Sequence, residues 1–208
     1  MTTIQREIVF ATVYYTNRSP RSNWLTDLGK YVGLDIVGVC VDDPCKSPYF
    51  STEFPLKKNP SLVTPSGFKL TETVAIIRYI ISKSEKPYFF GSNTEVRASC
   101  LSWLSFFNMD YMNAARDMFF NETREAKQLS IMKVRSLLEY VNDSVGGVER
   151  KYLCCNVILV ADIFAFKLVN IATSCGVEIS DLKRLTLYMN SVRLHPLIMK
   201  VTEASALL

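Results

Sequence analysis

The sequence is poor in the residues that build metal centres and structural disulfides. It has one histidine in 208 residues, and its six cysteines include no Cys-x-x-Cys pair. A zinc site normally needs two closely spaced pairs of ligands, so we expect no metal site. We interpret the cysteines as reduced thiols that serve as small apolar side chains, with a redox switch as the alternative. They are Cys40, Cys45, Cys100, Cys154, Cys155 and Cys175.

Strong charge and long apolar runs are also absent. The net charge is only +4, and no run of Lys and Arg is longer than two, so we expect no direct binding to nucleic acid, DNA included. The most apolar run, Val157–Ala172, contains Asp162 and Lys167 and is shorter than the roughly 20 residues that span a bilayer. The N-terminal residues lack the layout of a secretory signal. We therefore expect a cytoplasmic protein with no membrane association.

The sequence does have ample material for a core, and the first third of the chain predicts a mixed sheet. Apolar residues make up 49% of the chain and charged residues 21%. Ile8–Val13 and Leu34–Val41 predict buried strands on either side of a helix at Ser22–Tyr31. A polar loop follows. The order strand, helix, strand is typical of a small sheet with helices packed on it.

The stretch from Phe54 to Ile81 is the most informative part of the sequence. It predicts two short strands, Ser61–Val63 and Phe68–Leu70, which are joined by a turn at Pro65-Ser66-Gly67. A helix follows, because apolar residues after Glu72-Thr73 recur on one helical stripe. The sheet therefore gains two strands and a second helix.

Beyond a polar segment that ends in Pro87, the strand signals nearly vanish. We place a linker at residues 84–91, between a first domain at 1–83 and an all-helical domain at 92–208. Apolar spacings of three and four residues predict the helices of the second domain. Their expected ranges are 93–118, 122–141, 157–173, 181–192 and 197–204. The predicted fold class is an α/β thioredoxin-like domain followed by an all-α domain.

This arrangement resembles that of the glutathione transferases, and two motifs carry the resemblance. In that family a cis X-Pro bond precedes the third strand, which here matches Asn59-Pro60. An acidic and a hydroxyl residue at the next helix start bind the γ-glutamyl group of glutathione, and here they match Glu72-Thr73. The resemblance implies that Glu72 accepts from the ligand ammonium, while Thr73 and the free amides of the helix start receive a carboxylate. An ordinary helix start explains the same two residues.

Local strings also look like the N-terminal domain of the gamma subunit of translation elongation factor 1. They include FPLKKNP, GFKLTETVAI and Trp103-Leu104-Ser105-Phe106. This resemblance implies a non-catalytic module that scaffolds the nucleotide-exchange complex and needs no cofactor. Its partner would be the exchange subunit of the elongation factor, or aminoacyl-tRNA synthetases in a related docking role. A homodimer is a further expectation from the resemblance to transferases.

The alternative is an active glutathione transferase, which needs a hydroxyl near the end of the first strand to hold the glutathione thiol. The sequence offers Tyr14, Tyr15 and Ser19 as candidates, with Thr16 and Ser22 nearby, and does not single one out. Among the basic residues, Lys57 and Lys58 are candidates for binding the glycine carboxylate of glutathione, with solvated surface charges as an equal alternative. Arg18 and Arg21 present the same choice.

In the second domain, the helix at 157–173 is apolar nearly all round, so we expect it at the centre of the domain. We expect Asp162 to accept hydrogen bonds from backbone amides at the start of this helix. The family usually places a hydroxyl residue where this chain has Leu159, so part of the helix cap is expected to be missing, at roughly 1 kcal/mol. For the scaffold function, an apolar surface is expected at the end of the first long helix, unless these side chains pack in the core. The residues concerned are Tyr111, Met112, Met118, Phe119 and Phe120.

Overall fold

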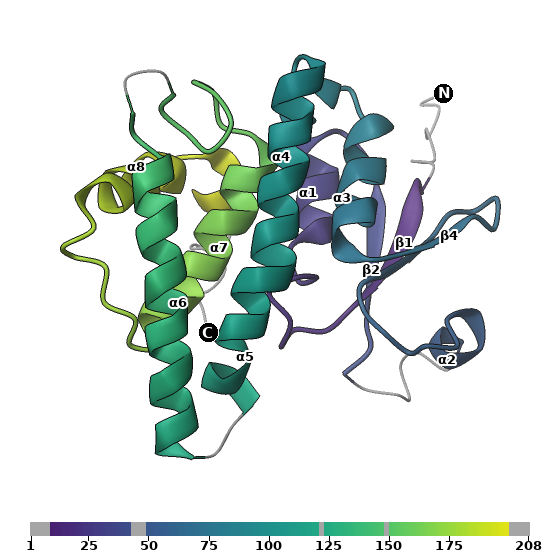
Figure 1. The fold of residues 1–208 in the computed structure, drawn as a ribbon. Helices are drawn as coiled ribbons and strands as arrows, with labels where there is room; N and C mark the ends of the chain where they lie inside the picture. The colour runs from purple at the N-terminus through teal and green to yellow at the C-terminus, as the bar shows by residue number, and fades with distance from the viewer. Residues whose placement is uncertain (1–8, 43–48, 121–122, 148–149, 200–208) are drawn as a thin grey trace. The chain divides into compact units, whose positions relative to one another are not determined.

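The computed structural model describes residues 9–42, 49–120, 123–147 and 150–199. The chain divides into two compact units, Met1–Pro87 (unit 1) and Tyr88–Leu208 (unit 2). Unit 1 contains a four-stranded sheet with helices, and unit 2 is helical (Figure 1). The predicted fold class is thus confirmed. The domain limits drawn from the sequence stay predictions.

The sheet of unit 1 is mixed, as the sequence predicts. It consists of β1 (Ala11–Tyr15), β2 (Ile36–Cys40), β3 (Ser61–Val63) and β4 (Lys69–Thr71) in the order β2-β1-β3-β4. β1 runs parallel to β2, whereas β3 runs antiparallel to both β1 and β4. The first strand begins later than predicted, and Ile8 lies outside the described residues.

Two helices of unit 1 supply the core of the sheet. α1 (Leu25–Tyr31) and α3 (Thr73–Ser82) bury their apolar stripes, and Val13 and Leu62 on the sheet are also fully buried. Gly29 is required where α1 crosses β2, because a Cβ there would lie only 2.5 Å from Cδ1 of Ile36. Figure 1 shows both helices beside the sheet.

A short helix, α2 (Phe50–Glu53), lies where the sequence predicts only loop. Phe50 and Phe54 are buried, and their rings contact Tyr14 at centroid distances of 5.3 and 5.7 Å. Neighbouring residues along a strand project to opposite faces. Tyr14 therefore lies on the face opposite to Val13, and α2 packs against that second face.

Unit 2 contains helices at nearly all of the predicted places. A 3₁₀ helix (Pro87–Phe90) begins at the last residue of unit 1, and the α-helices of unit 2 are α4 (Thr94–Phe106), α5 (Met112–Phe120), α6 (Arg124–Ser144), α7 (Val160–Ser174) and α8 (Lys183–Arg193). Residues 196–199 are also helical, and the rest of the last predicted helix lies outside the described residues. The predicted long helix at 93–118 is present, but a π-helical turn, Phe107–Tyr111, divides it into α4 and α5.

Helix α7 forms the centre of unit 2, and Asp162 holds its start. The Asp162 side chain is fully buried and accepts hydrogen bonds from the backbone N–H groups of Leu159 at 2.8 Å and Leu153 at 3.0 Å. The hydroxyl of Tyr188 donates a third bond at 3.0 Å. Leucine has no side-chain acceptor, so only the Asp162 half of the expected cap is present, as the sequence predicts. The side chain of Asn156 does not supply the missing acceptor at the helix start, because its oxygen accepts the backbone N–H of Lys151 instead.

Other expectations concern what the chain lacks. Within the described ranges, no helix is both long and apolar enough to cross a membrane. No group of His, Cys, Asp and Glu side chains in the same ranges is arranged to hold a metal ion. The five cysteines that the structure describes are free thiols, and Cys45 lies outside the described residues.

Candidate functional site

The strand register brings three segments together at one end of the sheet in unit 1. Tyr14 of β1 pairs with Ser61 of β3, and Ser61 pairs with Thr71 of β4. The residues just beyond these pairs are therefore neighbours. They are the loop after Tyr15, the Asn59-Pro60 segment before β3, and the Glu72-Thr73 start of α3. The sequence-predicted residues thus converge, although they lie up to some 60 positions apart.

The segment before β3 provides backbone groups at this end of the sheet. The Asn59–Pro60 peptide bond is cis, and Pro60 is buried. The ladder bonds of β3 begin at Ser61, so the backbone of Asn59 lies outside the ladder. Lys58 is exposed, and its carbonyl accepts a 2.7 Å hydrogen bond from the hydroxyl of Ser61.

Glu72 has an unusual backbone conformation. Its φ of 70° and ψ of 120° lie in a region that residues other than glycine rarely adopt. It occupies the N-cap position of α3, yet its side chain makes no capping hydrogen bond. The carboxylate is exposed, and the next residue, Thr73, is buried. Capping therefore does not explain the carboxylate at this position.

Arg21 lies within electrostatic reach of Glu72. Its side chain is half-buried, and burial lowers the pKa of the guanidinium, while the negative charge of Glu72 partly opposes that shift. The interpretation of Arg21 as an ordinary solvated charge is therefore wrong. The candidate site combines one carboxylate and one guanidinium, a pair suited to a ligand that carries both an ammonium and a carboxylate.

The hydroxyls of the loop after β1 are mostly engaged with the protein itself. Ser22 is buried, and its hydroxyl lies 3.3 Å from the carbonyl oxygen of Thr16 and 3.4 Å from that of Ser19. The hydroxyl of Thr16 donates to the carboxylate of Asp42, which also accepts the N–H of Asn17 at 3.0 Å. Ser19 is half-buried, and its hydroxyl makes no hydrogen bond within the described part of the chain. Ser19 therefore keeps a hydroxyl available for a ligand.

The two tyrosines of β1 project to opposite faces of the sheet. Tyr14 packs on Phe50 and Phe54, and burial together with the nearby charge of Glu53 raises its pKa. Tyr15 lies on the other face, where a Cβ at Gly38 would lie 3.0 Å from its Cε1 atom. Only one of the two can therefore face a ligand on a given side of the sheet.

The structure also adds a residue that sequence reasoning missed. The carboxylate of Asp42 fixes the Thr16–Asn17 turn, and these contacts hold its pKa below the usual range, with the Thr16 hydrogen bond as the main cause. Only the position of Asp42 after a predicted strand hinted at such a role. Residues at that end of a parallel strand pair meet the loop that leaves the neighbouring strand.

Most of the surface expected for a protein partner is not exposed. Tyr111, Met112 and Met118 are buried, so they pack in the core of unit 2. For these three residues the alternative of core packing is therefore confirmed, and they do not form the exposed apolar surface that a scaffold would use. Phe120 is 74% exposed, and the side chain of Phe119 lies outside the described residues.

Comparisons with known proteins show which sequences and folds this chain is similar to. The family model for the glutathione S-transferase N-terminal domain matches residues 11–82. The chain is similar to glutathione S-transferase Y-2 of Pichia kudriavzevii, with 42% identity over 92% of this chain and 98% of that protein. A crystal structure of a glutathione S-transferase from the same organism superimposes with a TM-score of 0.80 and 35% identity, and covers 95% of this chain and 98% of that one.

Similarity to the elongation factor is more limited. Elongation factor 1-gamma 2 of Saccharomyces cerevisiae is 36% identical over 107 residues, which cover 49% of this chain and 25% of that protein. Elongation factor 1-gamma of Schizosaccharomyces pombe matches 74% of this chain, but at only 26% identity and over 38% of that protein. The transferase similarity is thus both higher in identity and more complete over both proteins. The comparisons favour the transferase alternative over the scaffold function that the local strings suggested.

Proposed function

Because this chain belongs to the glutathione S-transferase family, we propose that it binds glutathione in unit 1 and conjugates it to small electrophilic molecules. The observation that carries this proposal is Glu72. Its backbone adopts a conformation that costs about 1–2 kcal/mol in a residue other than glycine, and its carboxylate does not cap the helix. A role in ligand binding accounts for both features, whereas an ordinary helix start accounts for neither.

The γ-glutamyl end of glutathione is the part that these residues suit. The carboxylate of Glu72 accepts from the ligand ammonium. The hydroxyl of Thr73 and the free N–H groups in the first turn of α3 receive the ligand α-carboxylate, where the partial positive charge of the helix end favours an anion. Arg21 adds a positive charge close to Glu72.

The remainder of the tripeptide extends toward the start of β3. The backbone of Asn59, next to Pro60, has groups outside the ladder with which the cysteinyl backbone pairs. Lys58 is exposed and supplies a cation for the glycine carboxylate. Both assignments rest on where these residues lie in the strand register.

We assign the thiol-binding role to Ser19. A hydrogen bond from its hydroxyl to the glutathione sulfur stabilises the thiolate and favours loss of the thiol proton to solvent. The sulfur then attacks an electrophilic carbon. The carbon–sulfur bond forms, and the leaving group departs with its electron pair. Tyr14 is less suitable because its ring is packed in an aromatic cluster, and the hydroxyls of Thr16 and Ser22 are already engaged.

Conjugation of glutathione to 1-chloro-2,4-dinitrobenzene tests the proposed activity. We expect turnover by the wild-type chain and a 10- to 100-fold lower kcat for Ser19→Ala, with the affinity for glutathione changed less than threefold. The loss should shrink at high pH, where the thiol ionises without help, and Ser19→Thr should restore activity. Ser22→Ala is not a suitable control because its hydroxyl holds the loop, so Ser180→Ala, at an exposed site in unit 2, serves instead. Absence of turnover in the wild type would overturn the enzyme function.

A second candidate is the scaffold function in translation, which the 36% identity to elongation factor 1-gamma 2 over half of this chain supports. Its partner would be the exchange subunit of elongation factor 1 or an aminoacyl-tRNA synthetase, and both functions would place the protein in the cytoplasm. Co-purification of the tagged chain from its own cells tests this candidate. Recovery of neither partner at a detection level that captures a known complex would contradict it.

A further inference from the structure

Two cysteines of unit 2, Cys100 and Cys154, come from distant parts of the sequence and meet near the start of α7. Cys100 is fully buried on α4, a helix that packs against α7. Cys154 is half-buried and belongs to the segment that leads into α7. Both are free thiols, and they lie more than 50 residues apart in the sequence.

The segment around Cys154 is fixed to the start of α7. The backbone N–H of Leu153 donates to the carboxylate of Asp162, in the first turn of that helix, at 3.0 Å. The N–H of Tyr152 donates to the carbonyl of Cys155 at 3.0 Å, so the chain makes a tight loop that includes Cys154. These two hydrogen bonds leave Cys154 little freedom to move away from the helix start.

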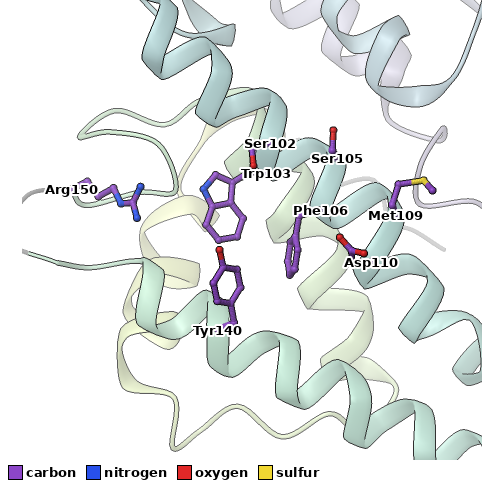
Figure 2. Close-up of a pocket in the computed structure, with 8 residues that line it drawn as sticks. All are labelled: Ser102, Trp103, Ser105, Phe106, Met109, Asp110, Tyr140 and Arg150. Carbon is purple, nitrogen blue, oxygen red and sulfur yellow. The ribbon is translucent and has the colours of Figure 1, made fainter.

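The same segment also approaches α4 next to Cys100. Arg150, a few residues before Cys154, lines a cavity together with Trp103 of α4, as Figure 2 shows. Trp103 follows Cys100 by one helical turn, and residues at that spacing are neighbours on the helix surface. Contacts with both helices therefore place Cys154 close to Cys100.

The two thiols interact directly. A side-chain hydrogen bond with Cys154 is the main cause that raises the pKa of the Cys100 thiol, and burial adds to it. Cys154 also lies within electrostatic reach of the buried Tyr188. Cys155 is engaged elsewhere, because its thiol donates to the carbonyl of Val157 with a sulfur–oxygen distance of 3.5 Å. Cys154 is therefore the partner of Cys100, and Cys155 is not.

We propose that Cys100 and Cys154 form a reversible disulfide when the protein meets hydrogen peroxide, and that this bond fastens the start of α7 to α4. The bond restrains a helix start at which Leu159 supplies no side-chain acceptor. Peroxide reaches the half-buried Cys154 first, because Cys100 has no exposed surface. The proposal does not depend on glutathione binding, so it stands whether or not the chain is a transferase.

The reaction needs no reagent other than the peroxide. The thiolate of Cys154 attacks one oxygen of hydrogen peroxide, the O–O bond breaks, and the hydroxide that leaves takes up a proton to become water. Cys154 is then a sulfenic acid. The sulfur of Cys100 attacks the sulfur of Cys154, the S–O bond breaks, and the hydroxyl leaves as water with the proton of Cys100. Two thiols are thus oxidised to one disulfide, and the peroxide is reduced to water.

Peptide mapping of the full chain, oxidised with hydrogen peroxide and alkylated without reduction, tests this proposal. Trypsin places Cys100 in the peptide 98–116, and Cys154 with Cys155 in the peptide 152–167. We expect mass spectrometry to recover these two peptides linked, and dithiothreitol to separate them. Absence of the linked pair after peroxide treatment, whatever the state of the two thiols, would overturn the proposal.

Three variants assign the bond and the order of its steps. Cys154→Ser should abolish the link, and the matched control Cys155→Ser should keep it; both residues are partly exposed, so these variants are expected to fold. Cys100→Ala removes only the second thiol, so the sulfenic acid of Cys154 should persist and react with dimedone roughly fivefold or more above the wild type. A link that survives Cys154→Ser, or one that is lost in Cys155→Ser, would contradict the assignment.

Thermal unfolding tests the effect of the bond on the fold. The disulfide closes a loop of more than 50 residues and lowers the entropy of the unfolded chain, so the oxidised wild type should melt about 5–10 °C above the reduced protein. Cys154→Ser treated with peroxide should melt within about 2 °C of its reduced form. Equal melting temperatures for the oxidised and reduced wild type would show that the bond does not fasten α7 to α4.

Discussion

At the scale of single residues, Glu72 combines backbone strain with a carboxylate that its own helix does not use. Its φ of 70° would be less strained in glycine, which has no Cβ to clash with the backbone. A chain selected only for stability would therefore favour glycine at this position. Strained residues concentrate at binding and catalytic sites, where the surrounding structure keeps them in the strained conformation.

Because Glu72 is strained but is proposed to bind the ligand, its replacement should change stability and glutathione binding in opposite directions. Glu72→Gly should raise the free energy of unfolding by about 1 kcal/mol, since relief of strain exceeds the extra entropy of glycine in the unfolded chain. The same change should weaken glutathione binding more than tenfold, because a charge-assisted hydrogen bond is lost. Denaturant unfolding and calorimetric titration measure the two effects.

Glu72→Gln is the matched control for that prediction. It keeps the strained backbone and removes only the charge, so it should weaken binding but leave stability within about 0.5 kcal/mol of the wild type. Unchanged glutathione affinity in both variants would show that the Glu72 carboxylate has no part in binding.

Asp162 offers a second test at this scale, through the dependence of stability on pH. Burial raises the pKa of the Asp162 carboxyl to about 6, although the hydrogen bonds from Leu159, Leu153 and Tyr188 oppose the shift. Between about pH 4 and pH 6 the unfolded chain ionises this group and the folded chain does not. Unfolding then releases a proton, so this group makes stability fall as the pH rises through that window.

The expected size of this effect is about 3 kcal/mol, from a pKa shift of about two units at roughly 1.4 kcal/mol each. Denaturant unfolding at a series of pH values, compared between the wild type and Asp162→Asn, isolates the contribution of this carboxyl. Asp162→Asn should be less stable at every pH but should lack this slope. A wild-type stability that rises from pH 4 to 6 relative to the variant would mean that the hydrogen bonds outweigh burial.

At the scale of elements, α8 is capped by a side chain from another helix. Its N-cap residue, Leu182, has no side chain that could accept a hydrogen bond. Instead, Oδ1 of Asn142 on α6 accepts the N–H groups of Arg184 and Leu185, both at 3.1 Å. This contact satisfies two of the backbone donors that a helix start leaves open.

Removal of this contact should destabilise unit 2. Asn142→Ala leaves both N–H groups without their acceptor and should lower the free energy of unfolding by about 1–2 kcal/mol. Asn142→Asp keeps an acceptor and places a negative charge at the positive helix end, so it should be at least as stable as the wild type. Thermal unfolding of the two variants measures the difference, and equal melting temperatures for both would contradict the capping role.

The elements that local sequence determines were predictable, and those that depend on distant contacts were not. The β3–turn–β4 hairpin follows from Gly67, whose φ of 83° the turn requires, and the apolar stripe of α3 follows from its spacing. The π-helical turn at Phe107–Tyr111 was missed, because one added residue shifts the helical pattern by less than a short sequence window resolves. The cap of α8 was missed because Asn142 lies more than 40 residues away.

The residues of the candidate site were likewise predictable where local sequence determines them and missed where distant contacts do. Glu72, Thr73 and Pro60 were found from residue types in a recognisable order, and the strand register brings them together. The electrostatic contact of Arg21 with Glu72 and the hold of Asp42 on the Thr16 turn depend on how loops meet across the sheet. The choice of Ser19 among the hydroxyls likewise depends on which of its neighbours are already hydrogen-bonded.

At the scale of the whole molecule, family membership and function rest on different observations. Similarity to a transferase over 92% of the chain establishes the family. The use of glutathione by this chain rests on the arrangement around Glu72, because one fold can carry several functions. The transferase and scaffold functions differ most simply in whether the γ-glutamyl end of glutathione is bound.

Calorimetric titration of the full chain with glutathione and with cysteinylglycine tests this claim most directly. The two ligands differ only in the γ-glutamyl group that Glu72 and Thr73 are proposed to hold. We predict a dissociation constant for glutathione below about 1 mM and at least 30-fold weaker binding of cysteinylglycine, as expected when two charge-assisted contacts are lost. Equal affinity for the two ligands, or no binding of glutathione at 10 mM (about ten times the predicted limit), would contradict the account.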